Sequence, residues 1–439
     1  MAQAPISDGP RSWPIVGDLP QFGRDPLRFF TTLAKRGPIV RWRFGRRPAL
    51  FLSEPGVVAE LFAADGATFD RPDSPLAFRM LLGNSVALAS GEDWQRKRAL
   101  VGPTLRPRQV RGYAATMVDC ADDLVRDWRP GDRVDLKREM ARLTQSVLIR
   151  AVFGGESTPA ERNTMAEAVD RAQLLIGKEL GGLGVVLPDR VPTPTRRRLA
   201  RVVAEIDEVI RTIVARISDD GSSRSDLLSR LRRSDDGWPA LSARELRDET
   251  VSLYVAGHET TSNALSWLWY LLARHPHVRD RMHAELDEVL AGRRPGIDDW
   301  PRLAYVRAVV QETMRIRPVA WMITTVAGEN TVIGGHHVPR GTRLWCSPWV
   351  THRDPRWWDD PEEFRPERWS GPVSSEAYFP FGSGPRGCPG TNFAMVESVL
   401  VVARLAQQHV FDVDPGEIRP APLLTLQPKG PVMATVSSR

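Results

Sequence analysis

Phe381-Gly-Ser-Gly-Pro-Arg-Gly-Cys388-Pro-Gly390 is the stretch on which the rest of this sequence depends, because it sets one cysteine among four glycines and two prolines. A periodic segment, Thr391 to Ala406, follows at once and predicts a helix. Glycine permits a tight loop that can approach a flat ligand closely. A helix start favours a thiolate over a thiol, and nearby Arg386 adds positive charge. The stretch therefore predicts a thiolate ligand for a soft or borderline metal centre.

The length and composition are those of a large globular protein. It has 439 residues, of which 42% are hydrophobic and 26% are charged. Length alone suggests two or three domains. No linker-like break interrupts the sequence, so we predict a single domain over residues 1–439. Proline and polar residues dominate residues 1–24, which predicts an extended N-terminal arm.

The charge balance indicates a basic surface without a nucleic-acid site. The net charge is +6, and arginine greatly outnumbers lysine among the 60 basic residues. These arginines are spread along the chain. The densest cluster, residues 196–198, opens a periodic helix and is expected to be a solvated face. A basic surface of this kind can dock an acidic protein partner.

The cysteines argue for a reducing compartment. Three cysteines, Cys120, Cys346 and Cys388, form neither a disulfide framework nor a zinc ribbon. The first twenty residues have neither the apolar core of a signal peptide nor the apolar length of a membrane anchor. We therefore expect a cytoplasmic protein with no membrane anchor.

Hydrophobic periodicity predicts a mainly α-helical fold with a smaller β-rich region. A long stretch from Phe69 to Ser90 is expected to be a functional loop. Residues 181–192 are expected to form a mobile, apolar lid. The main predicted helices cover residues 109–128, 136–153, 158–180, 194–218, 242–274, 278–290, 303–316 and 391–406, and the main predicted strands cover residues 39–44, 49–52, 423–426 and 432–436.

The longest predicted helix contains Ala256-Gly-His-Glu-Thr-Thr261. A zinc-protease motif would need a second histidine where Ser262 stands, so that function is excluded. The scattered histidines likewise predict no histidine metal site. Small residues at Ala256 and Gly257 allow a flat cofactor to approach the helix. The Thr260 hydroxyl can bond the carbonyl of residue 256 and bend the helix.

Three further motifs contain charged and aromatic residues. Trp94 and Arg98 are four residues apart and share a helix face. Glu312 and Arg315 do so at a spacing of three, which by itself is a weak signal. Phe364-Arg-Pro-Glu-Arg368-Trp369 follows them.

These motifs, in this order, resemble the cytochrome P-450 family of haem-thiolate monooxygenases. The match at the cysteine loop is Phe-x-x-Gly-x-Arg-x-Cys-x-Gly, from Phe381 to Gly390. The resemblance implies the cytochrome P-450 fold, with haem b between the long central helix and the cysteine loop. It also implies that Cys388 is the axial thiolate and that Phe381 and Arg386 lie at the cofactor.

The resemblance implies roles for the remaining motifs. Thr260 would hydrogen-bond the activated oxygen, and Glu259 would relay protons to it. Trp94 and Arg98 would bind the haem propionates. Glu312, Arg315 and Arg368 would form a structural network behind the cysteine loop.

One position departs from the family pattern. Thr325 stands where many relatives have an arginine for a propionate. Trp94, Arg98 and Arg386 would then carry more of that binding, with His352 as a further candidate.

The implied reaction is insertion of one oxygen atom from O2 into an apolar small molecule, which we expect to be a terpenoid or polyketide. Its electrons would come from a separate ferredoxin or flavodoxin with its reductase, and we expect a monomer. Alternatives are peroxide-driven or coupling chemistry, or a haem-binding protein without turnover. The substrate pocket is expected to include Trp321 and Met322, with residues 75–86, 174–187, 255–256, 319–323 and 423–424.

Overall fold

The computed structural model describes residues 5–64, 68–154, 157–180, 187–216, 227–231 and 239–439. The chain divides into two compact units, and the boundary falls inside the longest helix, α12 (Ala243–Arg274). The first unit comprises residues 1–72, 125–140 and 260–439, and the second comprises residues 73–124 and 141–259. The prediction of a single domain over residues 1–439 stays a prediction.

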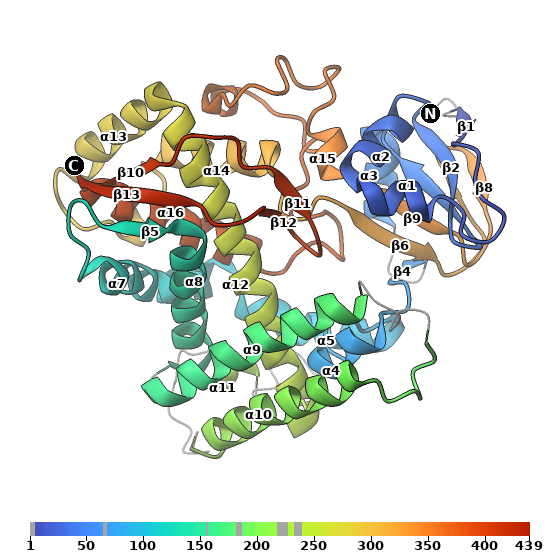
Figure 1. Ribbon diagram of the computed structural model, residues 1–439, viewed down its shortest axis with the longest axis horizontal. Helices are drawn as coiled ribbons and strands as arrows, with labels where there is room; N and C mark the ends of the chain where they lie inside the picture. Colours follow the sequence, from blue (N-terminus) through green and yellow to red (C-terminus); the bar gives the residue numbers. More distant parts are fainter. Residues whose placement is uncertain (1–4, 65–67, 155–156, 181–186, 217–226, 232–238) are drawn as a thin grey trace. The chain divides into compact units, whose positions relative to one another are not determined.

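The first unit combines a group of helices with every strand that lies in the described residues (Figure 1). Its helices, besides parts of α8 (Leu136–Phe153) and α12, are α1 (Leu19–Arg24), α2 (Pro26–Ala34), α3 (Pro55–Ala63), α13 (Pro276–Leu290), α14 (Ala304–Ile316), α15 (Pro348–Thr351) and α16 (Thr391–Gln408). Its strands are β1 (Ile6–Asp8), β2 (Ile39–Phe44), β3 (Arg47–Leu52), β4 (Phe69–Asp70), β5 (Arg133–Asp135), β6 (Ile323–Ala327), β7 (Thr331–Ile333), β8 (His336–Val338), β9 (Arg343–Cys346), β10 (His409–Val413), β11 (Pro420–Pro422), β12 (Leu426–Pro428) and β13 (Met433–Ser438).

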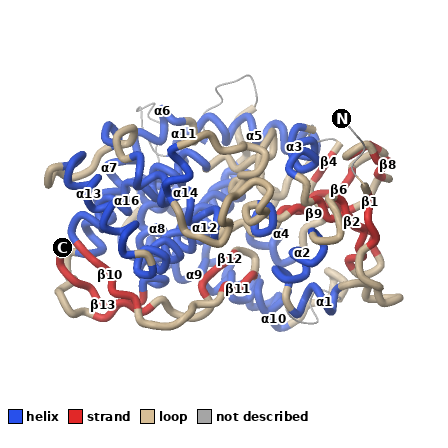
Figure 2. The backbone as a smooth tube through the Cα atoms, turned by 90° about the horizontal axis from the view of Figure 1, so that it is seen from above, coloured by secondary structure: helices blue, strands red, loops and turns tan. Residues whose placement is uncertain are grey.

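The largest sheet brings distant parts of the chain together in the order β1-β2-β3-β9-β6-β4. Strands β2 and β3 form an antiparallel hairpin in which Ile39 pairs with Leu52. Helix α2 packs on them, and the rings of Phe30 and Phe51 stack at 4.8 Å between centroids. A separate sheet joins β10, β13 and β5 (Figure 1), and β10 and β13 are seen again near the C-terminus in Figure 2.

The second unit is helical in the part of the chain that the structure describes. Besides parts of α8 (Leu136–Phe153) and α12, it holds α4 (Leu76–Leu82), α5 (Gly91–Thr104), α6 (Pro107–Val110), α7 (Ala114–Val125, all but its last residue), α9 (Pro159–Leu180), α10 (Pro194–Arg216) and α11 (Leu227–Leu231). Helices α9 and α10 pack side by side (Figure 1). Helix α10 buries an apolar stripe at three- and four-residue spacing, from Leu199 through Val202 and Ile206 to Ile213.

Most predicted helices are confirmed to within a few residues, and α12 also confirms its predicted start. Ser242 and Glu245 form a reciprocal capping box, in which each side chain accepts the backbone N–H of the other at 3.3 and 2.9 Å. The helix ends before His275-Pro276, as the proline predicts.

The prediction of an extended N-terminal arm is wrong for its last six residues, because Leu19–Arg24 form α1. The extended strand β1 does not stand apart, since it pairs in parallel with β2. Proline is tolerated in the first turn of a helix, where Pro20 lies. The Asp18 carboxylate accepts the Arg43 backbone N–H at 2.8 Å and fixes this segment to β2.

The stretch from Phe69 to Ser90 is also more ordered than predicted, since it contains β4 and α4. Helix α4 begins after Pro75 and ends at Gly83, whose φ of +57° favours glycine. The Asp248 carboxylate occupies the space that a Cβ at Gly83 would need, and it accepts the Asn84 backbone N–H at 2.9 Å.

Two smaller predictions are corrected. Arg196 is not solvated: it is buried, and its Nε lies 2.6 Å from Glu179, while its other nitrogens donate to backbone carbonyls of the chain that precedes α10. Residues 423–425 form the turn between β11 and β12 instead of a strand. Residues 181–186 of the predicted lid lie outside the described residues.

Candidate active site

The cysteine loop is closed by backbone hydrogen bonds within the first unit. The Cys388 N–H donates to the Phe381 carbonyl at 2.9 Å, and the Gly387 N–H donates to the Gly384 carbonyl at 3.0 Å. The Thr391 hydroxyl, at the start of α16, donates to the Cys388 carbonyl at 2.9 Å. The loop therefore holds an exposed thiol just before a helix N-terminus, as predicted.

Gly384 lets this loop pack directly on α3. Its φ is +67°, and a Cβ built there would lie 1.8 Å from the backbone carbonyl oxygen of Phe62. Backbone atoms cannot yield as a flexible side chain can, so only glycine fits. The Phe62 ring also packs against Phe379, with centroids 5.4 Å apart. The position of the thiol is thus fixed by contacts with α3.

Two arginines accompany the thiol. The Arg386 Nη2 lies 2.5 Å from Asp70 Oδ1 at the end of β4. The adjacent Arg71 is exposed to solvent, yet desolvation by surrounding protein is the first cause that lowers its pKa, and Arg386 is the second. Asp70 and Cys388 act in the opposite direction on that pKa. Arg71 therefore lies within electrostatic reach of both Cys388 and Arg386.

Arg71 is a candidate site residue that the sequence did not reveal. Strand β4 pairs with β6, so that Asp70 lies opposite Val326. The Thr325 hydroxyl donates to the Asp70 carbonyl at 2.6 Å. Thr325 therefore stabilises the backbone just before Arg71. This pairing joins segments 255 residues apart, which no local sequence pattern indicates.

The side chains around Cys388 fit a haem. A thiolate suits the iron, and guanidinium groups such as those of Arg71 and Arg386 suit the two propionate carboxylates. Cys388 is exposed, which leaves its thiol accessible to a ligand. This part of the first unit thus supplies an accessible soft ligand and positive charge.

Glu312 lies at the centre of the predicted structural network, which the structure brings together. Its fully buried carboxylate accepts two bonds from Arg315 and one from Arg368 Nε, each at 2.9 Å. It also accepts the Trp369 indole N–H and the Arg365 backbone N–H, each at 3.0 Å. The network thus fixes the segment between α15 and the cysteine loop.

His352 connects this network to the start of the cysteine loop. Its carbonyl accepts from Arg315 at 2.8 Å, and its Nε2 accepts the Phe379 backbone N–H at 3.0 Å. Burial, followed by the charges of Arg315 and Arg353, lowers the pKa of His352 well below its usual value. A buried neutral ring that already accepts a backbone N–H is a structural element and a poor partner for a propionate.

The predicted acid, Glu259, belongs to the second unit, and its chain neighbour Thr260 belongs to the first. Both side chains are half-buried. Glu259 Oε2 accepts from the Gln173 side-chain amide of α9 at 3.0 Å. Sequence reasoning did not find Gln173, because α9 has only weak amphipathic periodicity and Glu259 lies 86 residues away in the chain.

Small residues precede the acid on α12. Ala256 is exposed, as an opening for a flat cofactor requires. Gly257 faces α8, since a Cβ there would lie 2.8 Å from a methyl carbon of Leu148. Close helix packing is therefore an additional reason for glycine at this position.

Trp94 and Arg98 lie on α5 in the second unit, one turn apart as predicted. Trp94 is buried and Arg98 is half-buried. Between them, Lys97 is buried and pairs with Asp93 at 2.7 Å. Their role at the propionates stays a prediction.

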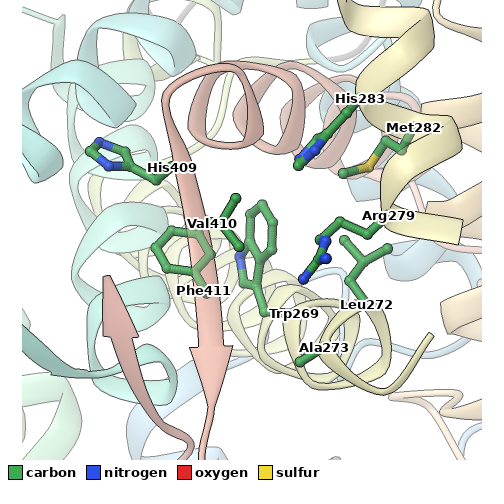
Figure 3. Close-up of a pocket in the computed structure, with 9 residues that line it drawn as sticks. All are labelled: Trp269, Leu272, Ala273, Arg279, Met282, His283, His409, Val410 and Phe411. Carbon is green, nitrogen blue, oxygen red and sulfur yellow. The ribbon is translucent and has the colours of Figure 1, made fainter. Parts of the chain in front are cut away.

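A pocket in the first unit lies among α12, α13 and β10 and contains none of the predicted site residues (Figure 3). Burial is the first cause that lowers the pKa of His283, one of its lining residues, to about 4. The pocket is lined by Trp269, Leu272, Ala273, Arg279, Met282, His283, His409, Val410 and Phe411. Within the described residues, no cluster of three or more histidine, cysteine or acidic side chains forms a metal site, and no helix is long and apolar enough to cross a membrane.

Comparisons with known proteins agree with the cysteine loop. The family model described as cytochrome P-450 matches residues 8–435. The cyclooctat-9-en-7-ol 5-monooxygenase of Streptomyces melanosporofaciens is 33% identical over 427 residues, which cover 95% of this chain and 90% of the relative. Cyclooctatin synthase of the same organism is 32% identical, with 95% and 92% covered. Pentalenene oxygenase of Streptomyces avermitilis is 29% identical, with 95% and 94% covered.

Proposed function

Since this chain belongs to the cytochrome P-450 family and is a monooxygenase of that family, we propose that its substrate is an apolar cyclic terpenoid and that its haem is haem b. The observation that carries the assignment is the exposed Cys388 thiol, held by a glycine-dependent loop beside Arg71 and Arg386. When bound, haem with a thiolate ligand supplies O2 binding and O–O cleavage. The protein's own residues bind, orient and deliver protons.

On the thiolate side, the chain fixes the ligand and balances charge. Cys388 provides the sulfur, and its loop is held by α3 and by the Glu312 network. We assign Arg71 and Arg386 to the propionates, in place of the arginine that Thr325 replaces. Trp94 and Arg98 keep the propionate role that the resemblance implies, and this part of the proposal rests on sequence.

On the oxygen side, the chain handles protons. The Thr260 hydroxyl would hold and pass on a proton at its Oγ1, and the Glu259 carboxyl would exchange protons with solvent. General acid–base groups of this kind contribute about 10²- to 10⁴-fold in rate. The Gln173 amide orients the Glu259 carboxylate, as the 3.0 Å bond supports.

A terpenoid substrate is supported by the names of the relatives, two of which act on cyclooctat-9-en-7-ol and pentalenene as their names state. Apolar residues of the first unit, which also contains the cysteine loop, fit such a substrate. The Trp321 indole donates to the Leu423 carbonyl at 2.9 Å, which places Leu423 and Leu424, both exposed, beside the segment that starts at Val319. Trp321 itself is buried in the core cluster that includes Phe30 and Trp345, and its predicted place in the substrate pocket stays a prediction.

O2 and a redox partner are the co-reactants of a cytochrome P-450 monooxygenase. We propose a ferredoxin or flavodoxin with its reductase as the electron source, with this chain acting as a monomer in the cytoplasm. The net charge of +6 supports an acidic donor. The three free cysteines, two of them buried, fit a reducing compartment.

Turnover with oxygen-18-labelled O2 tests this function. A panel of cyclic terpene hydrocarbons and alcohols is incubated with the holoenzyme, a surrogate ferredoxin and its reductase. The expected product carries one labelled oxygen atom per molecule. Product made only with added peroxide, without label from O2, would support the peroxide-driven alternative, and absence of any product with every donor would support a haem protein without turnover.

A further inference from the structure

We infer that Asp170 of α9 is the solvent-exposed entry of the proton supply to Glu259, and that Gln173 is the positioning residue that orients the Glu259 carboxyl. This inference rests on the proposed function, because it extends the proton delivery of Glu259 and Thr260 outward. All residues that carry it belong to the second unit.

The first step is the direct contact between α9 and α12. Gln173 Nε2 donates to Glu259 Oε2 at 3.0 Å, and both side chains are half-buried. A glutamine amide has no proton to give at neutral pH, since its N–H groups do not ionise. Its contribution is therefore to hold the carboxyl in one orientation.

The second step is the placement of a titratable group on the same helix face. Asp170 lies three residues before Gln173, so both project from one side of α9. The Asp170 side chain is exposed, whereas its Oδ1 accepts from the buried Gln145 amide of α8 at 3.1 Å. One carboxyl thus faces both water and the interior of the second unit.

The third step is the electrostatic link between the two carboxyls. The pKa of Asp170 is raised, first by burial of part of the group and further by the negative charges of Glu259 and Glu167, while the Gln145 bond lowers it. The charge of Asp170 also contributes to raising the pKa of Tyr254, after burial. Asp170 and Glu259 therefore lie within electrostatic reach, where a proton on one changes the affinity of the other for protons.

Proton transfer through this pair balances. One proton enters Asp170 from water, one passes through water to Glu259, and one leaves Glu259 toward the reacting oxygen, so that both carboxyls return to their starting state. Among the described residues, Glu167 on α9 and Tyr254 on α12 also interact electrostatically with Asp170, and the His258 ring stacks on Tyr254. Burial lowers the pKa of His258 to about 4 and raises that of Tyr254, so neither changes charge near neutral pH.

The first test needs no turnover. The carboxyl carbon of Asp170 is titrated by NMR in protein labelled with carbon-13 aspartate, with Asp170→Asn used for assignment. Glu259→Gln is expected to lower the pKa of Asp170, since a like charge is removed, and Gln145→Leu is expected to raise it, since a hydrogen bond to the charged form is lost. An unchanged Asp170 titration in Glu259→Gln would overturn the link.

The second test measures coupling of electron uptake to product, with Glu208→Gln as the control, because Glu208 is an exposed acid on α10 that pairs with Arg211. Asp170→Asn is expected to reduce product formation about tenfold and to increase the solvent isotope effect, with recovery in Asp170→Glu. Gln173→Leu should lower coupling while leaving substrate affinity unchanged. If Thr260→Ala uncouples electron uptake from product while Asp170→Asn keeps wild-type coupling, the inference about Asp170 is overturned and the proposed function stands. If Thr260→Ala itself keeps wild-type coupling, the proposed role of Thr260 is overturned.

Discussion

Replacing Glu312 by alanine is expected to destabilise the fold by about 3–5 kcal/mol, because removing one partner of a buried ion pair leaves the other charge uncompensated. Two guanidinium groups would lose their counter-charge, and one of them, on Arg315, is fully buried. The backbone N–H of Arg365 and the indole N–H of Trp369 would lose their acceptor as well. Since about 1.4 kcal/mol corresponds to a tenfold change, the equilibrium constant for folding should fall about a hundred- to several-thousandfold.

The assay is urea unfolding followed by tryptophan fluorescence and circular dichroism. Glu208→Ala is the matched control, because Glu208 pairs with Arg211 at the same three-residue spacing while both side chains are more than half exposed. Exposed pairs of this kind contribute about 0–1 kcal/mol. If Glu312→Ala costs no more than this control, the buried network does not stabilise the cysteine loop, and the reasoning is refuted.

Three further predictions address acid stability, backbone strain and haem binding. Burial lowers the pKa of His258 from the ordinary 6.5 to about 4, so the unfolded state takes up its proton first and acidification from pH 6.5 to 4 should cost about 3 kcal/mol of stability; His258→Phe should flatten that part of the stability profile. Gly384→Ala should cost several times more stability in thermal melts than Gly371→Ala, whose added Cβ meets nothing within 4 Å. Arg71→Gln should speed haem transfer to apomyoglobin about tenfold at low salt and leave the melting of the haem-free protein unchanged; an unchanged transfer rate would exclude Arg71 from the propionates.

Local signals in the sequence predicted the helices well. The apolar spacing from Leu136 to Phe153 and the capping box at Ser242 act within one or two turns, so a short window contains them. The cysteine loop is also local, since its glycines, its cysteine and the helix start lie within a dozen residues.

Long-range contacts account for what the sequence did not reveal. The sequence predicted a solvated Arg196, because only the packing of α9 against α10 brings Glu179 and the preceding carbonyls to it. Arg71 and Gln173 became site candidates through the pairing of β4 with β6 and the contact of α9 with α12. A propensity scale cannot indicate such partners, since burial and charge environment arise only in the folded chain.

The central claim is that Cys388 is a thiolate ligand of haem, and the absorption difference spectrum of the reduced, CO-bound protein tests it most directly. Wild-type protein is expected to show the strongly red-shifted Soret band of a haem-thiolate protein, and Cys388→Ala is expected to lose it. Cys346→Ala is the control, because that thiol is fully buried and burial raises its pKa. A red-shifted band that survives in Cys388→Ala, or a folded wild-type protein that binds no haem, would contradict the account.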